Sequence, residues 1–399
     1  MDVSKYNELI SIASIGSSFE DLKRPCQVYG IGPHSIAFYD EAVVRSKEIL
    51  EEIYLKNKEI STYSSYNSYV EYVLPIISSK KEANLKFDDD DEKKIIKYFK
   101  SKPIEDITVW REITGIELKK ESKIQLGEFT IINWKIEKAS IEKDLKYNPE
   151  VIWMKQVYDY LIGVKVKARD FRKAQEISDL HFRAFENIIH IIIGYPDKNN
   201  FVSILDYDNG LIGRSLLYSD ELGLSSQLPG WKRVITPLEI DNDYFKEKYF
   251  IKLYELITKN NKNEMQKRLL LAANWLGQAI KYNEIVDGYL KSVIALEILF
   301  SVNINGLISP SITYQISESI ALILGESVEN KIEIEKEIKD LYSKRSSIVH
   351  SGNASINRID YLKACKYSRA IIMILINDEK YSVNKIEEVL ELLKRQKYS

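Results

Sequence analysis

Two side chains near the C-terminal end of the chain have the types and the spacing needed for phosphodiester chemistry. Arg345 precedes His350 by five residues, and the chain contains only four histidines. A guanidinium keeps its charge at physiological pH and can bind a phosphate group through two parallel hydrogen bonds. An imidazole gives or takes a proton near neutral pH, because its ordinary pKa lies in that range. Together these groups could stabilise a charged phosphate and transfer a proton beside it.

The segment before Arg345, Lys331–Tyr342, predicts a helix. Four apolar residues stand at the spacing of one buried helix face: Ile334, Ile338, Leu341 and Tyr342. The same face continues to Arg345, Ile348 and Val349, so we expect the guanidinium to point inward. A buried charge needs a partner of opposite sign, because removing it from water is costly.

Glu297 is the expected partner of that arginine. It lies within Val293–Phe300, where its neighbours are apolar, so a carboxylate there needs a cation. We expect Glu297 to orient Arg345 and not to transfer protons. Tyr342 and Asn353 are expected to contact phosphate or to brace His350.

The positions of Arg345 and His350 on a helix also predict where that helix ends. Residues five apart on a straight α-helix point about 140° away from each other. The helix should therefore end or loosen near His350, and Ser351–Asn353 supplies a glycine at Gly352 that could stop it.

The C-terminal third of the chain is predicted to form an all-α bundle. Asp241–Thr258 is helical, and the polar joint Lys259–Asn263 follows it, which places a domain boundary within 240–263. Six further helices with short connections are expected at 264–282, 288–303, 312–324, 331–350, 358–377 and 384–397.

The run Arg345–His350 resembles the signature of the HEPN superfamily, in which a histidine follows an arginine after four to six residues. Ala273-Asn-Trp-Leu276 and Ala295-Leu-Glu297 precede it on predicted helices. Their order is similar to that of the ApeA-like branch of the superfamily. The resemblance covers roughly residues 262 to 399.

This resemblance implies a metal-independent endoribonuclease that needs no cofactor, with Arg345 and His350 as catalytic residues. Such enzymes pair two bundles, so it implies a homodimer in which both Arg–His sets line one cleft. Attack by the ribose 2′-hydroxyl would leave a 2′,3′-cyclic phosphate and a 5′-hydroxyl. Similar proteins cut RNA, often tRNA, in abortive antiphage defence. The alternative is a non-catalytic HEPN-like dimerisation module that serves as a scaffold or regulator.

Residues 1–240 are expected to form a mixed α/β domain, which makes the whole chain an α+β protein. This domain, which could comprise two subdomains, is assigned a sensor or regulatory role with an unknown trigger. Residues 241–263 are expected to form a helical connection, and 264–399 the effector bundle.

Residues 1 to about 60 are predicted to be mostly helical. The more specific expectations are a helix at Asp40–Leu55, a helix start at the acids Asp88–Glu92, a hairpin at Ile124–Trp134 with Gly127 at its turn, a strand at Tyr160–Lys167, a helix at Asp170–Ile193, and a strand pair Phe201–Tyr207 and Leu211–Tyr218 around Asp208–Gly210.

Composition limits the remaining possibilities. A chain of 399 residues exceeds the usual size of one core, so two or more domains are expected. The net charge of −2 gives no overall basic field that would indicate nucleic acid. Cys26 and Cys365 match no zinc spacing, and His181 and His190 would face opposite sides of one helix, so no metal site is predicted. We expect a cytoplasmic protein without a membrane segment.

Overall fold

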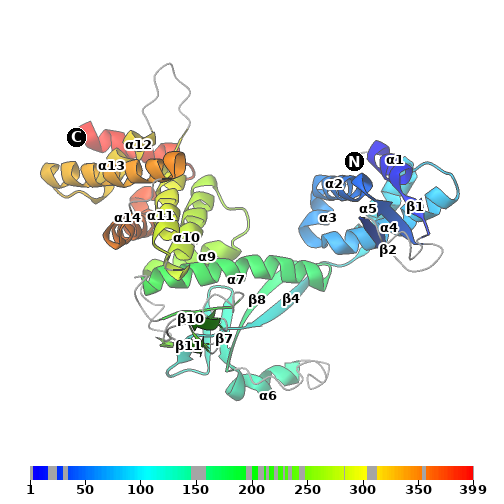
Figure 1. The fold of residues 1–399 in the computed structure, drawn as a ribbon, viewed down its shortest axis with the longest axis horizontal. Helices are drawn as coiled ribbons and strands as arrows, with labels where there is room; N and C mark the ends of the chain where they lie inside the picture. Colours follow the sequence, from blue (N-terminus) through cyan, green and yellow to red (C-terminus); the bar gives the residue numbers. More distant parts are fainter. Residues whose placement is uncertain are drawn as a thin grey trace. The chain divides into compact units, whose positions relative to one another are not determined.

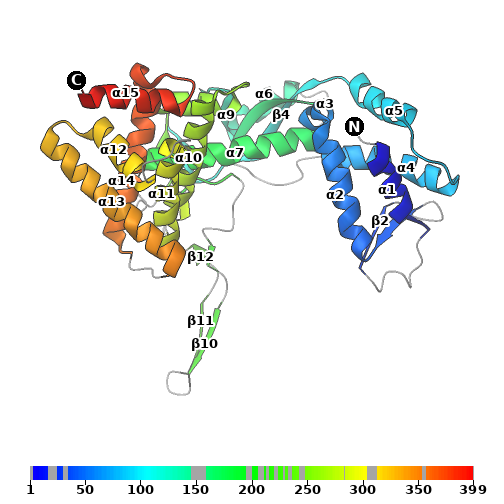
Figure 2. The same ribbon diagram turned by 90° about the horizontal axis from the view of Figure 1, so that it is seen from above.

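The computed structural model divides the chain into two compact units (Figures 1 and 2). Unit 1 comprises Met1–Val109 and Lys165–Asp179, and unit 2 comprises Trp110–Val164 and Leu180–Ser399. The structure describes residues 3–16, 25–29, 35–144, 159–194, 200–204, 211–212, 215–219, 223–227, 230–231, 236–241, 248–282, 284–302, 312–352 and 356–398. No helix within these ranges combines the length and the apolarity that crossing a bilayer requires.

The predicted fold class is confirmed at the level of secondary structure. Strands and helices alternate through the N-terminal part, and only helices follow Ile240 in the described ranges. Residues 241–263, where the sequence predicts a domain boundary, lie inside unit 2. Separate regulatory and effector domains therefore stay a prediction.

Unit 1 packs helices against a small antiparallel sheet. Its elements are α1 (Val3–Ile12), β1 (Ser14–Ile15), β2 (Cys26–Tyr29), β3 (Ile36–Tyr39), α2 (Glu41–Lys56), α3 (Lys58–Tyr63), α4 (Tyr66–Glu82) and α5 (Asp89–Ser101). The sheet has the order β1-β3-β2. The prediction of a mostly helical start missed these strands, because they are only two to four residues long and too short to show alternation.

The two helix predictions in unit 1 are confirmed. Helix α2 covers the predicted Asp40–Leu55 segment almost residue for residue. The acidic run starts α5, where the Asp88 side chain accepts hydrogen bonds from the N–H groups of Asp90 and Asp91. Asp91 in turn accepts from the N–H of Asp88, which completes a reciprocal cap.

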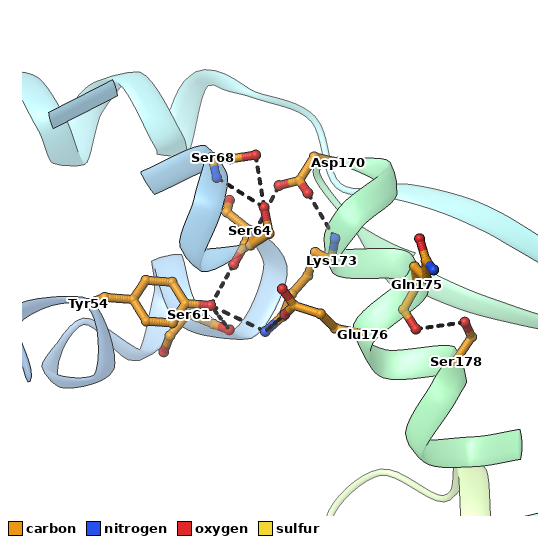
Figure 3. Close-up of polar contacts among 10 residues, drawn as sticks. Tyr54, Ser61, Ser64, Ser68, Asp170, Lys173, Gln175, Glu176 and Ser178 are labelled. Carbon is orange, nitrogen blue, oxygen red and sulfur yellow. Dashed lines mark hydrogen bonds and ion pairs between the residues drawn. The ribbon is translucent and has the colours of Figure 1, made fainter. Parts of the chain in front are cut away.

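Asp170 joins two helix N-termini inside unit 1 (Figure 3). One carboxylate oxygen accepts the N–H of Lys173 at 2.8 Å, and the other accepts the N–H of Ser65, the first residue before α4, at 3.0 Å. Burial raises the pKa of Asp170, but these hydrogen bonds outweigh burial and hold the pKa below its ordinary value. Nearby, Tyr54 donates to the carbonyl of Ser64 at 2.8 Å.

Three elements contribute residues to both units. They are β4 (Glu105–Glu112), β8 (Tyr160–Ala168) and α7 (Phe171–Ile193). The bounds of β8 and α7 confirm the predicted strand Tyr160–Lys167 and the predicted helix Asp170–Ile193.

A four-stranded sheet has the order β4-β8-β7-β6, and its strands β6 and β7 lie in unit 2. The hairpin β6 (Lys123–Leu126) and β7 (Phe129–Asn133) turns at Gly127, whose φ of 56° lies in the left-handed region that favours glycine. The predicted hairpin is therefore confirmed. Phenylalanines of α7 cover this sheet: the Phe129 ring lies 6.3 Å from that of Phe182 and 5.0 Å from that of Phe185.

The predicted pairing of Phe201–Tyr207 with Leu211–Tyr218 is wrong where the structure describes these residues. Ser203 pairs with Thr114 through an isolated bridge. Strand β9 (Leu211–Ile212) pairs with β12, and β10 pairs with β11. The predicted turn at 208–210 lies outside the described residues. The remaining elements before the bundle are α6 (Trp134–Asp144), β5 (Ile116–Leu118), β10 (Ser215–Ser219), β11 (Gly223–Gln227), β12 (Gly230–Trp231) and β13 (Leu238–Ile240), which pairs with β5 in parallel.

The helical part of unit 2 follows the predicted boundaries closely. Its helices are α9 (Lys248–Thr258), α10 (Glu264–Tyr282), α11 (Ile285–Phe300), α12 (Ile312–Leu324), α13 (Val328–Ser351), α14 (Arg358–Asn377), the 3₁₀ turn η4 (Glu379–Tyr381) and α15 (Ile386–Tyr398). Helices α10, α11 and α14 lie side by side in both views (Figures 1 and 2). The all-α prediction for this region is confirmed.

A buried ion pair joins α7 to α10 within unit 2. Lys281 Nζ lies 3.3 Å from a Glu186 carboxylate oxygen, and the side chains are only 1% and 0% exposed. The same carboxylate accepts the N–H of Ile204. Gly277 permits the close approach, because a Cβ there would lie 2.2 Å from the carbonyl oxygen of Asn187.

We expect Lys281→Met to lower the free energy of unfolding by about 3–5 kcal/mol, because the buried carboxylate of Glu186 would lose its buried cation. The double variant Glu186→Gln/Lys281→Met should regain most of that loss, since glutamine still accepts from Ile204. Urea unfolding at pH 7 measures both. A double variant no more stable than the single one would contradict the assigned pairing.

Asp170→Asn should lose about 1 kcal/mol at pH 7, because asparagine can accept only one of the two capping hydrogen bonds. Because the pKa of Asp170 is lower in the folded protein than in the unfolded chain, its carboxylate stabilises the fold fully above about pH 4, the ordinary pKa. This stabilisation is lost as the pH falls through the lower, folded pKa. The difference from wild type should therefore shrink on acidification in urea titrations at pH 7 and pH 3. Asp89→Asn, at an exposed acid of α5, is the control and should show no such trend.

Candidate active site on the helical bundle

Helix α13 carries both predicted catalytic residues. Ser327 caps its start by accepting the N–H of Asn330. Ile334, Ile338 and Leu341 are buried, which confirms the predicted inward face. That face ends near the arginine, because Val349 is 54% exposed and does not point inward as expected.

Arg345 and Glu297 meet as predicted. Arg345 Nη2 donates to Glu297 Oε2 at 3.0 Å. Arg345 Nε lies 2.9 Å from Oε1, an ion-pair contact whose angle falls outside hydrogen-bond geometry. The side chains are 21% and 18% exposed, so the pair is largely but not completely removed from water. It connects α13 to α11.

Tyr342 completes this group on the same helix. It forms a side-chain hydrogen bond with Glu297, and the guanidinium carbon of Arg345 lies 5.7 Å from the centre of its ring. Burial raises the pKa of Glu297, and the nearby Arg345 and Tyr342 only partly offset that rise. Burial, and then the negative charge of Glu297, also raise the pKa of the Tyr342 hydroxyl. Tyr342 therefore contacts the carboxylate, and its predicted contact with phosphate stays a prediction.

His350 lies in the last turn of α13 and is exposed. The helix ends one residue later at Ser351, where Gly352 adopts a φ of 65° and its N–H bonds to the carbonyl of Ile348. The helix ends near His350 as expected, but its regular part includes both Arg345 and His350. Their side chains therefore leave it about 140° apart, and the structure does not bring the two together within one chain. Asn353, the remaining predicted site residue, lies outside the described residues.

Two contacts that position this helix were not found from the sequence. Tyr289 on α11 donates to the carbonyl oxygen of Leu341, which anchors α13 one turn before Arg345. Lys344 Nζ lies 2.7 Å from an oxygen of Asp360, whose carboxylate also accepts the N–H of Asn357 in the reciprocal cap of α14. The sequence shows Lys344 next to the motif and Asp360 in the first turn of a predicted helix. Neither position indicates that the two side chains meet across the bundle.

The other polar residues weighed for chemistry have structural surroundings. Asn274 accepts a hydrogen bond from Asn187 at 3.3 Å, so it packs α10 against α7. His190 is buried and bonds the carbonyl of Glu186 at 2.6 Å. His181 is partly buried and not on the open surface, and burial with the nearby Lys262 lowers its pKa to about 4. Within the described ranges, no three His, Cys, Asp or Glu side chains are grouped to hold a metal ion.

Comparisons of the chain with protein-family models, with curated proteins and with solved structures found no match. The resemblance to the HEPN superfamily therefore depends on the motif and on the order of its helices.

Arg345→Met should lower the free energy of unfolding by about 1–3 kcal/mol at pH 7, because it leaves Glu297 charged in a largely dry site. The deficit should be smaller near pH 4, where Glu297 can take up a proton. The pKa of Glu297 is higher in the folded protein than in the unfolded chain, so the protein loses stability as the pH rises from the unfolded pKa to the folded pKa. Removing Arg345 raises the folded pKa further and therefore enlarges this loss.

Urea unfolding at the two pH values tests this expectation, with Glu297→Gln/Arg345→Met as the matched control. The double variant should show a nearly pH-independent difference from wild type in this range. An Arg345→Met deficit that is equal at both pH values would refute the proposed electrostatic coupling.

Proposed function

We propose that the protein is a metal-independent endoribonuclease of the HEPN type, with Arg345 and His350 as its catalytic residues. The observation that carries the proposal is the orientation of Arg345. Glu297 holds the guanidinium through its Nε–Nη2 edge, and the side chain stays partly exposed. The exposed imidazole of His350 stands near the end of the same helix.

The guanidinium has a second edge that can bind an anion. Among the described residues, Nη1 of Arg345 has no hydrogen-bond partner. The Nη1–Nη2 end therefore retains N–H donors in the forked geometry that matches two phosphate oxygens. An arginine whose other edge is fixed by Glu297 loses less conformational entropy when it binds phosphate, so it is suited to stabilise a transition state.

The reaction needs one group to remove the proton of the ribose 2′-hydroxyl and another to protonate the departing 5′-oxygen. The 2′-oxygen attacks phosphorus, the bond to the 5′-oxygen breaks, and a 2′,3′-cyclic phosphate and a 5′-hydroxyl result. One chain supplies one His350 for these two proton transfers. A homodimer formed through the bundle would supply two, which is why we include dimerisation in the proposal.

The wider role that we propose is antiphage defence by abortive infection, with RNA, including tRNA, as substrate. An RNase that is always active would harm its host, so the N-terminal region would restrain it until a trigger arrives.

The rival function is a non-catalytic scaffold built on the same bundle. One observation favours it: the Arg345–Glu297 pair connects α11 to α13 and could serve packing alone. The two functions differ in what they require of His350, which is exposed and has no evident role in packing.

We expect the full-length protein to cleave unfractionated tRNA in EDTA and to leave 2′,3′-cyclic phosphate ends. His350→Ala should lower the rate by about 10²-fold or more, because it removes the proton-transfer group. Arg345→Lys keeps the charge but loses the fork, and should lower the rate by about 10²-fold. Gel analysis of time courses with end-group mapping gives both rates.

Ser343→Ala, an exposed change on α13, is the matched control and should cleave like wild type. Each variant should also unfold at the wild-type urea midpoint, except for a small shift in Arg345→Lys. Cleavage that persists in His350→Ala, or products with 3′-hydroxyl ends, would eliminate this mechanism. A wild-type protein that cleaves no RNA would favour the scaffold function.

A further inference from the structure

Unit 2 has a cavity of about 690 Å³ away from the residues of the candidate active site. It lies where α9, the start of α10, the end of α14 and the η4 turn meet. Its volume falls within the range of pockets that hold a drug-sized ligand. Neither the motif nor the proposed reaction uses any of its lining residues.

The inner wall of this cavity is apolar. The residues that form it come from all three helices, from η4 and from the segment after it: Leu256, Met265, Leu269, Leu375, Ile376, Tyr381 and Val383. Most of them are buried, so they belong to the packed core and give the wall a fixed shape. A ligand would place an apolar group against this wall.

Charged side chains of opposite sign come from different elements of the lining. Lys252 lies on α9 and Lys259 directly follows it, whereas Asp378 and Glu379 follow the end of α14. None of these four has an ion-pair partner in the part of the chain that the structure describes, although ion pairs are common elsewhere in the chain. The C-terminal end of α14 adds the negative end of a helix dipole to the acidic side.

The α9 side keeps its positive character for a structural reason. Lys262 Nζ donates to the carbonyls of Ile257 and Lys259, so it covers the negative end of α9. Glu255 is the one acid that α9 contributes to the lining. The lining thus takes its cations from α9 and the residue after it, and two carboxylates from the segment after α14.

Carboxamide groups in the lining supply further hydrogen-bond donors. Asn263 and Gln266 cap α10 reciprocally, and Asn263 Nδ2 also donates to Asn384 Oδ1 at 2.9 Å. These bonds use the oxygens of Gln266 and Asn384. Their amide nitrogens have no partner among the described residues, and each can donate to a carbonyl group.

We propose that this cavity binds a short peptide with free termini and apolar side chains. Its ammonium end would lie by Asp378 and Glu379, its carboxylate by Lys252 and Lys259, and its backbone carbonyls by the two carboxamides. Charge complementarity at both ends favours a dipolar ligand over a purely anionic or cationic one, because either of those would face like charges at one end. The inference is independent of the ribonuclease proposal.

Isothermal titration of the full-length protein with Leu-Leu-Leu tests this inference. The free tripeptide should bind at least tenfold more tightly than its N-acetylated, C-amidated form, which has the same apolar side chains but no terminal charges. Glu379→Lys should weaken binding of the free peptide about tenfold, and Lys252→Glu should do the same. Glu387→Lys, an exposed acid of α15 outside the cavity, should have no effect.

Ser382→Trp is a second test that does not depend on charge. Ser382 lines the cavity and is exposed, so a tryptophan there can block it without entering the core. This variant should abolish binding of Leu-Leu-Leu and keep the wild-type urea midpoint. Equal binding of the free and blocked peptides, tighter binding of spermidine or inorganic phosphate than of Leu-Leu-Leu, or no binding at millimolar concentration would overturn the proposal.

Discussion

The ion pair between Glu297 and Arg345 is the constraint on which the candidate site depends. Each group alone would be a largely desolvated charge, and among the residues that the structure describes Arg345 is the cation that pairs with Glu297. Their pairing allows α11 and α13 to pack with a guanidinium at their interface. Because Glu297 takes only one edge of that guanidinium, the same contact also holds the Nη1–Nη2 edge in a fixed direction, where the phosphate of the proposed reaction would bind.

A second ion pair in unit 2 shows by contrast what a purely structural pair looks like. Glu186 and Lys281 are almost fully buried, and Glu186 also accepts a backbone N–H. No part of that pair faces solvent. Arg345 and Glu297 retain about a fifth of their surface, so a phosphate could reach the guanidinium in the site that we propose.

Local patterns allowed much of the fold and the central pair to be predicted. Helical periodicity set the bounds of α10, α12 and α14, and an arginine on an apolar face together with Glu297 in an apolar run predicted their contact. What failed depended on pairing across the chain: the short strands of unit 1 and the partners of β9 and β10. The contact between Lys344 and Asp360 and the cavity by α9 were missed for the same reason, since tertiary packing and not spacing creates them.

The two ends of α14 take part in different polar sites, an ion pair with α13 at the start and the cavity lining at the end. This limits how a ligand in the cavity could affect the residues around Arg345. Its first turn bonds to α13 through Asp360 and Lys344, next to Arg345. Its last turn lines the cavity at Leu375 and Ile376, about 24 Å from Asp360 along the helix. A ligand there can change the arrangement around Arg345 only if it binds one position of α14 better than another. Because α14 is packed against α10 and α11 along its length, such a shift would have to move the helix as a rigid element and could not remain local to the cavity.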